Sequence, residues 1–164
     1  MVCWVCLVSC ERNASIAQAI QKQWEDGLGI EVQLEAIEPK IFFQRVSSKE
    51  FQLAASSWVP DFNDPINFLE VFKYKQGGTN NTNWESAKYI DLLELSALCK
   101  DSEERKNFLR AAEQILMEQM PIIPVFHFAL NYLLKEGLED VALSPLGQID
   151  FRWARMAQEK ETVR

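Results

Sequence analysis

The amino-acid sequence predicts an α/β domain in which helices pack on a layer of strands. Within the first 57 of its 164 residues, segments with the two-residue period of strands alternate with segments of helical period, in the order strand, helix, strand, helix, strand. Apolar residues make up 48% of the chain, which is enough for a sizeable core. This alternation is typical of layered α/β proteins.

Each of the five segments has its own local sequence signature. Residues 2–8 are apolar and short, as in a buried strand, and the helix that follows has Asn13 as a suitable N-cap and glycines at its end. Residues 30–35 alternate apolar and polar, which predicts a second strand. A proline suits the first position of a helix within residues 38–46, and residues 51–55 alternate again as a third strand.

Loops and helices dominate the middle of the chain. Residues 58–84 combine turn-forming residues with aromatics and predict a long loop that contains a brief helix over 66–72. Helices are predicted over 85–99 and 102–119, the second with a capping box formed by Asp101 and Glu104. The apolar faces expected for these two helices consist of Ile90, Leu93 and Ala97, and of Phe108, Ala112, Ile115 and Leu116.

The last third of the chain predicts short strands. Residues 122–128 and 130–134 are strongly apolar and read as strands, and a shorter strand is expected near 149–153. The polar residues 157–164 are expected to form a frayed tail.

Charge limits the classes of partner. Acidic residues outnumber basic ones 24 to 17, which gives a net charge of -7. This balance argues against nucleic acid and against an anionic membrane surface as partners. No apolar run approaches the roughly 20 residues that a membrane-spanning helix needs. A soluble, globular protein is therefore expected.

The four cysteines predict neither a metal site nor a redox site. Cys3, Cys6 and Cys10 lie within the first ten residues and Cys99 lies far away, while the only histidine is His127. A closed zinc site needs four ligands, and strand positions three apart point to opposite faces. Cys3, Cys6 and Cys10 are interpreted as small buried residues, and no cofactor is expected.

Residues 7–10 (LVSC) also resemble a bacterial lipoprotein cleavage site. No Lys or Arg precedes this segment, and its apolar run barely reaches the minimum of about 7 residues. A core strand is the favoured interpretation, and an export signal with lipidation of Cys10 is the alternative.

Patterns of several common active sites are missing. A Ser–His or Cys–His pair would have to use His127, which lies in an apolar run where a lone histidine is more often packed in the core, and there is no G-x-S-x-G motif. The glycine pair at 77–78 lacks the lysine of a phosphate-binding loop. The acidic cluster at 61–64 lacks the glycine and glutamate of a calcium loop.

Residues 58–65 (WVPDFNDP) form the strongest candidate site. They follow a predicted strand and place carboxylates among aromatics and prolines. A carboxylate in such surroundings is costly unless a cation satisfies it, so it suits a ligand ammonium group, with Trp58 adding a π-face. For Asp64 a helix-capping role is favoured. For Asp61 the binding role and the turn-forming role stand equal.

Several blocks occur in the order found in a known family: ERNASIAQAIQKQWEDGLGIEVQLE, SSWVPDFNDPINFLEVF, AAEQILMEQMPIIPVFHF, NYLLK and SPLGQIDFRW. Over about residues 11–156 the chain resembles the C-terminal part of the solute-binding proteins of peptide ABC transporters, the periplasmic oligopeptide-binding family (extracellular solute-binding family 5). The W-x-x-D-x-N-D-P pattern is the most specific of these blocks.

The resemblance implies a type II periplasmic-binding-protein-like lobe over residues 1–156, in which an extended peptide pairs with strands between two lobes. By position, Asp61 would bind the α-ammonium of the peptide, and backbone groups of Ser57, Trp58 and Val59 would face its first residues. It further implies a binding protein rather than an enzyme, permease subunits as partners of the complete protein, and a periplasmic or cell-envelope location.

Three positions depart from the family pattern. Pro39 stands where relatives commonly have a tryptophan, and Ala55 stands where oligopeptide binders often carry an arginine. His127 replaces an aromatic in a stretch that approaches the ligand in relatives, which adds His127 to the candidate site.

Family members are much longer, so the resemblance implies a truncated lobe that lacks the N-terminal lobe. A chain that supplies the missing lobe is therefore a candidate partner. The alternative is a non-transport remnant that acts only as a protein-interaction module. A hydrolase that uses Asp61 and Asp64 is the third hypothesis.

Overall fold

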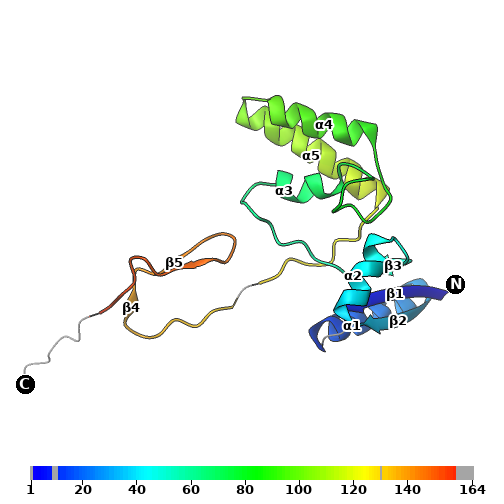
Figure 1. Ribbon diagram of the computed structural model, residues 1–164, viewed down its shortest axis with the longest axis horizontal. Helices are drawn as coiled ribbons and strands as arrows, with labels where there is room; N and C mark the ends of the chain where they lie inside the picture. Colours follow the sequence, from blue (N-terminus) through cyan, green and yellow to red (C-terminus); the bar gives the residue numbers. More distant parts are fainter. Residues whose placement is uncertain (1, 9–10, 130, 158–164) are drawn as a thin grey trace, which may run out of the picture.

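The computed structural model describes residues 2–8, 11–129 and 131–157, whose elements pack in three groups. The first group is a small parallel sheet with two helices, and the second is a set of helices. The third, the hairpin group, consists of one short hairpin and a second antiparallel strand pair that encloses it in sequence, and it lies apart from the other two in Figure 1. The mixed helix and strand content agrees with the predicted α/β class.

The sheet group follows the predicted order of elements. It comprises β1 (Val2–Val8), α1 (Glu11–Leu28), β2 (Glu31–Ile37), α2 (Pro39–Ser47) and β3 (Leu53–Ala54). The strands are parallel in the order β2-β1-β3, so the first strand of the chain is central and the other two are edges.

The start of α1 and the length of β3 differ from prediction, and β2 extends two residues beyond its predicted end. Asn13 is not an N-cap, because α1 already begins at Glu11; glutamate and arginine are good helix formers and extend the helix toward β1. β3 has only two residues, since Ala55 falls outside the pairing with β1. The end of α1 agrees with prediction, and Gly29 there adopts φ +65°.

The start of α2 is capped as the sequence indicates. Pro39 occupies its first position, and the Glu38 carboxylate accepts hydrogen bonds from the backbone N–H groups of Lys40 and Ile41 at 3.0 and 3.3 Å. Phe42 and Val46 on this helix are buried against Ile37 of β2 and form the core of the sheet group.

The two edges of the sheet differ. On β2, the carbonyl of Val32 accepts a hydrogen bond of 2.7 Å from the Gln21 side chain, and its N–H donates to the Glu25 carboxylate at 3.4 Å. Both partners lie on α1, which therefore occupies backbone groups that another strand would need. β3 leads into residues 55–60, which carry no regular secondary structure.

The helical group contains the brief helix and the two long helices that were predicted. It comprises α3 (Ile66–Leu69), the 3₁₀ turn η1 (Glu70–Phe72), α4 (Ala87–Leu98) and α5 (Ser102–Gln119). The carboxylate of Asp101 accepts from the N–H of Glu104 at 2.8 Å, which confirms the predicted N-cap of α5.

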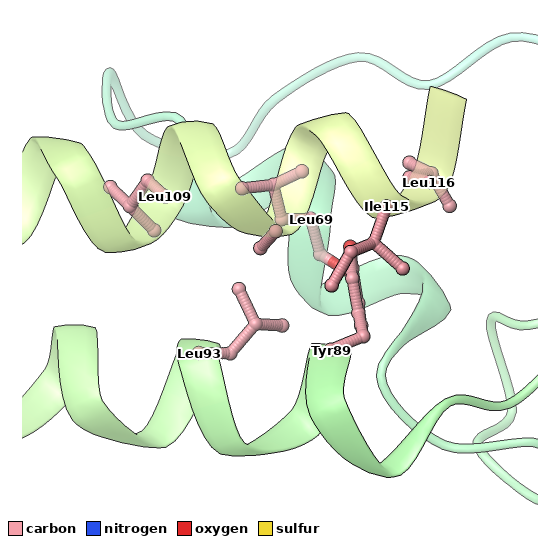
Figure 2. Close-up of a cluster of buried hydrophobic side chains, with 7 residues drawn as sticks. Leu69, Tyr89, Leu93, Leu109, Ile115 and Leu116 are labelled. Atoms are coloured by element: carbon pink, nitrogen blue, oxygen red, sulfur yellow. The ribbon is translucent and has the colours of Figure 1, made fainter. Parts of the chain in front are cut away.

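The core of this group lies between α4 and α5, with α3 against them (Figures 1 and 2). The Tyr89 hydroxyl points across the core and donates a 2.7 Å hydrogen bond to the carbonyl of Leu69 at the end of α3. Burial raises the pKa of Tyr89, so it stays a neutral donor. The buried cluster consists of Leu69, Tyr89, Leu93, Leu109, Ala112, Ile115 and Leu116.

Most of the predicted helix faces are correct. Leu93, Ala112, Ile115 and Leu116 are buried as expected. Ala97 is exposed instead, because the buried stripe of α4 runs through Tyr89, Leu93 and Ser96 and leaves Ala97 on the outer side.

The strands predicted at 122–128 and 130–134 are wrong for the residues that the structure describes there. This stretch is irregular, and its side chains from Ile123 onward are exposed, Leu133 completely so. A strand needs a neighbour that takes its backbone hydrogen bonds, and no strand in the described chain pairs with this segment. Residue 130 lies outside the described residues.

The hairpin group is built from two-residue strands. β4 (Leu138–Glu139) pairs with β7 (Arg155–Met156), and β5 (Ala142–Leu143) pairs with β6 (Ile149–Asp150), both antiparallel. β6 confirms the first two residues of the strand expected near 149–153. The polar tail predicted at 157–164 lies outside the described residues from 158 onward.

One lysine connects the sheet group with the helical group. Lys49, in the turn after α2 with φ 61°, donates from Nζ to the carbonyl of Lys75 at 3.1 Å and to the Asn83 side chain at 2.9 Å. Among the described helices, none combines the length and apolarity required to cross a membrane.

Candidate functional site

Four of the five candidate residues lie on the segment that joins β3 to α3. Ser57, Trp58, Val59 and Asp61 are all exposed, with Trp58 at 39% and Val59 at 72%. In the part of the chain that the structure describes, no backbone–backbone hydrogen bond involves residues 57–60. The segment therefore presents free backbone donors and acceptors next to an edge strand.

A buried asparagine holds this segment in place. The Oδ1 atom of Asn67 accepts a 2.8 Å hydrogen bond from the Trp58 indole Nε1–H and a 3.3 Å hydrogen bond from the backbone N–H of Asp61. Since both donors converge on one atom, Trp58 Nε1 and the Asp61 nitrogen lie no more than about 6 Å apart. Trp58 and Asp61 are thus tied to the same acceptor atom, and their roles toward a ligand stay predictions.

Asn67 was missed by the sequence reasoning. It is only 8% exposed, in a short helix that otherwise buries leucine. The available signal was a polar residue inside an apolar helical stretch (INFL) close after the Trp–Asp pattern.

Asp64 has the structural role that the sequence favoured. Its Oδ1 atom accepts a 2.9 Å hydrogen bond from the N–H of Ile66, at the start of α3. It also forms two hydrogen bonds with Arg105 of α5, at 2.9 and 3.0 Å. The bond from Arg105 holds the pKa of Asp64 below its usual value.

Asp61 differs from Asp64 in every respect that matters for binding. Its side chain is exposed, and within the described residues it forms neither an ion pair nor a hydrogen bond through its carboxylate. Of the two carboxylates in the W-x-x-D-x-N-D-P pattern, Asp61 is the one available to an external cation.

His127 lies elsewhere. It is exposed in the irregular segment that follows α5, so the interpretation as a packed core histidine is wrong. Among the described residues, no hydrogen bond or ion pair joins His127 to Ser57, Trp58, Val59 or Asp61.

The described residues contain no group of three His, Cys, Asp or Glu side chains that could hold a metal ion. Cys99, after α4, is a free thiol, and partial desolvation together with its hydrogen bond to Glu104 raises its pKa. It is thus poorly suited to act as a thiolate nucleophile. The side chains of Cys3, Cys6 and Cys10 lie outside the described part.

Residues 8–80 match the family described as "Bacterial extracellular solute-binding proteins, family 5 Middle", a range that includes the whole WVPDFNDP block. The chain is 36% identical over 142 residues to the oligopeptide-binding protein OppA of Bacillus subtilis, covering 87% of this chain and 26% of OppA. It is 31% identical to the periplasmic murein peptide-binding protein MppA of Escherichia coli, covering 82% of this chain and 26% of MppA.

Solved structures agree with these sequence matches. The chain superposes on the E. coli murein tripeptide binding protein MppA with a TM-score of 0.77 and 27% identity, over 85% of this chain and 27% of MppA. It superposes on the peptide-binding pheromone receptor PrgZ with a TM-score of 0.76 and 27% identity, over 96% of this chain and 30% of PrgZ. The chain thus spans about a quarter of the length of the curated relatives it matches.

Proposed function

Because this chain belongs to family 5 of the bacterial extracellular solute-binding proteins, which are peptide-binding components of ABC importers, we propose that it forms part of a peptide-binding site. The part proposed here receives the amino-terminal end of an extended peptide. The single observation that carries this role is the exposed Asp61 carboxylate, which has no partner among the described residues and whose backbone N–H shares the Asn67 acceptor with the Trp58 indole.

The β3 side of the sheet is the side on which a peptide can add. Its continuation through Ser57, Trp58 and Val59 has free backbone groups, whereas the backbone of Val32 on the opposite edge is already hydrogen-bonded to α1. An extended peptide that pairs with residues 57–59 gains main-chain hydrogen bonds that do not depend on its side chains. Such pairing suits a binder with broad sequence tolerance.

Asp61 and Trp58 recognise the positive charge of the peptide's α-ammonium group. The Trp58 Nε1 and the Asp61 backbone nitrogen are within about 6 Å of each other, so the two residues that would recognise the ammonium group are anchored at the same place in the loop. Cations are attracted to an aromatic face within about 6 Å of the ring centroid. His127 is proposed as a further ligand contact in the assembled site, by the family resemblance alone.

The family also suggests which partners the protein has and where it acts. In the complete protein the partners are peptides and the permease subunits of an ABC importer, in the periplasm or cell envelope. For the present chain, a separate polypeptide that supplies the other lobe is a further proposed partner. The protein binds without turning over its ligand. A remnant that only docks on another protein is the alternative, and size-exclusion chromatography with light scattering separates them: obligate association favours the remnant.

Isothermal titration calorimetry with a library of di- to pentapeptides tests the ammonium role. We expect saturable binding of peptides with a free amino terminus and much weaker binding of the same library after N-acetylation. Asp61→Asn removes the charge with little change of shape and should abolish this difference. Asp91→Asn is the matched control, because it removes one exposed carboxylate on α4, away from the loop.

The binding free energy lost in Asp61→Asn depends on how far the site is shielded from water. At a separation of about 4 Å a pair of unit charges is worth about 1 kcal/mol in water and about 4 kcal/mol near a protein surface. In the complete protein, where the second lobe covers the ligand, loss of the Asp61 charge should cost roughly 3–5 kcal/mol of binding free energy. A loss below about 1 kcal/mol there would rule out the ammonium role.

A further inference from the structure

Asn67 is a polar residue built into the apolar core of the helical group. It is the second residue of α3 and is 8% exposed, while Leu69 in the same helix belongs to the main buried cluster. Burying a side-chain amide lowers the stability of the folded protein unless the amide forms hydrogen bonds. Its Oδ1 atom meets that condition through the donors of Trp58 and Asp61.

These two hydrogen bonds have an unusual arrangement. They connect one acceptor atom to the side chain at one end of the segment 58–61 and to the backbone at the other end. A carbonyl oxygen can do this because it has two lone pairs. An apolar residue at position 67 would leave both the indole N–H and the Asp61 N–H without this acceptor.

The position of Asn67 is itself fixed by the core. Its backbone N–H donates to the carbonyl of Asp64 at 3.1 Å, and the Asp64 carboxylate is held by Arg105 of α5. At the other end of α3, the Leu69 carbonyl accepts a hydrogen bond from the buried hydroxyl of Tyr89, whose side chain reaches toward Leu69 in Figure 2. A continuous series of contacts therefore runs from α4 and α5 through α3 to the loop.

We infer that Asn67 is the positioning residue of the cation site, because it fixes the Trp58 indole relative to the backbone of Asp61, which carries the recognising carboxylate. This inference rests on the proposed ammonium role of Asp61. It assigns selectivity for a charged amino terminus to a residue outside the binding surface. Without Asn67, the two recognition groups would move independently, and the ligand would have to order them on binding.

Two substitutions separate the hydrogen-bonding role from simple packing. Asn67→Leu keeps the number and branching of the side-chain heavy atoms and removes the acceptor. Asn67→Asp keeps an Oδ1 acceptor for both donors and should retain the arrangement. A matched control is Asn80→Leu, because Asn80 is 1% exposed and its side chain holds the neighbouring loop through Phe72, Thr82 and Trp84.

The first measurement uses the protein without ligand. Hydrogen exchange of the indole N–H of Trp58, assigned in NMR spectra with a Trp58→Phe variant, reports the Asn67 bond directly. We expect exchange to be about tenfold faster in Asn67→Leu, and within about threefold of wild type in Asn67→Asp and Asn80→Leu. Unchanged exchange in Asn67→Leu would overturn the inference whatever the ligand results.

The second measurement is the ratio of dissociation constants for N-acetylated and free-amine peptides from the same library. A lower fraction of folded protein weakens the binding of both peptides equally. The ratio of the two dissociation constants therefore does not change when a variant is only less stable. Asn67→Leu should reduce the ratio to that of Asp61→Asn, while Asn67→Asp and Asn80→Leu should keep at least about half of the wild-type ratio.

The outcomes distinguish the two proposals. If wild type shows no preference for the free amine, the ammonium role fails, and with it the inference. If wild type prefers the free amine and Asp61→Asn abolishes the preference, but Asn67→Leu keeps it, only the positioning role of Asn67 is refuted. Equal losses of the ratio in Asn67→Leu and Asn80→Leu would also refute it, because they would indicate general loosening.

Discussion

The ion pair between Asp64 and Arg105 is expected to determine how firmly α3 is held against α5. The perturbation is a double-mutant cycle of Asp64→Asn and Arg105→Met. Asparagine keeps an oxygen that can accept from the N–H of Ile66, and methionine keeps much of the apolar stem of arginine, so the cycle isolates the charge interaction.

The geometry and exposure of the pair set limits on the coupling free energy between Asp64 and Arg105. The guanidinium forms two hydrogen bonds, at 2.9 and 3.0 Å, and each side chain is 30% exposed. Exposed pairs contribute about 0.2–1 kcal/mol, whereas breaking a buried pair costs about 3–5 kcal/mol. A bidentate pair with this intermediate exposure should give a coupling free energy of about 1–2 kcal/mol.

Urea unfolding followed by far-UV circular dichroism at neutral pH measures the coupling. The pH dependence gives a second test, because Arg105 lowers the pKa of Asp64 in the folded protein. A carboxyl with a lowered folded pKa contributes stability above its unfolded pKa of about 3.9, and this contribution disappears as the pH falls through the folded pKa. Asp64→Asn should therefore lose part of the acid destabilisation seen below about pH 4.

The reasoning would be refuted by a coupling free energy below about 0.3 kcal/mol, the uncertainty of such cycles for independent sites. An acid transition in Asp64→Asn identical to that of wild type would refute the pKa argument separately. A coupling that vanished only at high salt would place the pair among screened surface contacts.

Two further predictions concern buried contacts, and one concerns the sheet edge. Tyr89→Phe leaves the Leu69 carbonyl without its partner and should lower the free energy of unfolding by about 1–2 kcal/mol, measured by urea unfolding. Asn80→Ala removes a buried amide that organises its loop and should cost about 1–3 kcal/mol in the same assay, with changes near zero contradicting its role. Gln21→Ala frees the carbonyl of Val32 for pairing with another strand, so light scattering should show more dimers or larger species. A mass distribution identical to that of wild type would contradict this role of Gln21.

Local sequence patterns predicted most helices and their ends. Periodicity placed α2, α4 and α5 to within two residues, because their caps are formed by neighbours in sequence such as Glu38 and Asp101. The start of α1 was predicted wrongly because two local signals conflict. Asn13 is a good capping residue, but Glu11 and Arg12 before it are good helix formers, and the helix includes them.

Non-local contacts account for what the sequence could not predict. Arg105 is 41 residues from Asp64, and no spacing rule connects them. The strands predicted after α5 failed because apolar composition indicates burial in a sheet, but the described chain offers no strand to pair with them. Asn67 was missed because its hydrogen bonds depend on how the loop folds back over α3.

The candidate site could be predicted in part. The Trp–Asp pattern drew attention to Trp58 and Asp61 from residue chemistry, and the structure places them next to one acceptor atom. The distinction between the two acidic residues needed the structure, because only Arg105 shows that Asp64 is already neutralised. The ligand roles of Ser57 and Val59 stay predictions.

The unequal edges of the sheet limit how the protein can self-associate. Open-ended fibres require every chain to offer two free strand edges, one for each neighbour. Here α1 already occupies backbone groups of β2. Two molecules that associate through their β3 sides would therefore expose only their β2 edges, where the backbone of Val32 is already hydrogen-bonded. Strand-mediated assembly should therefore stop at a pair, and a peptide bound along residues 57–59 would compete with that pairing for the same edge.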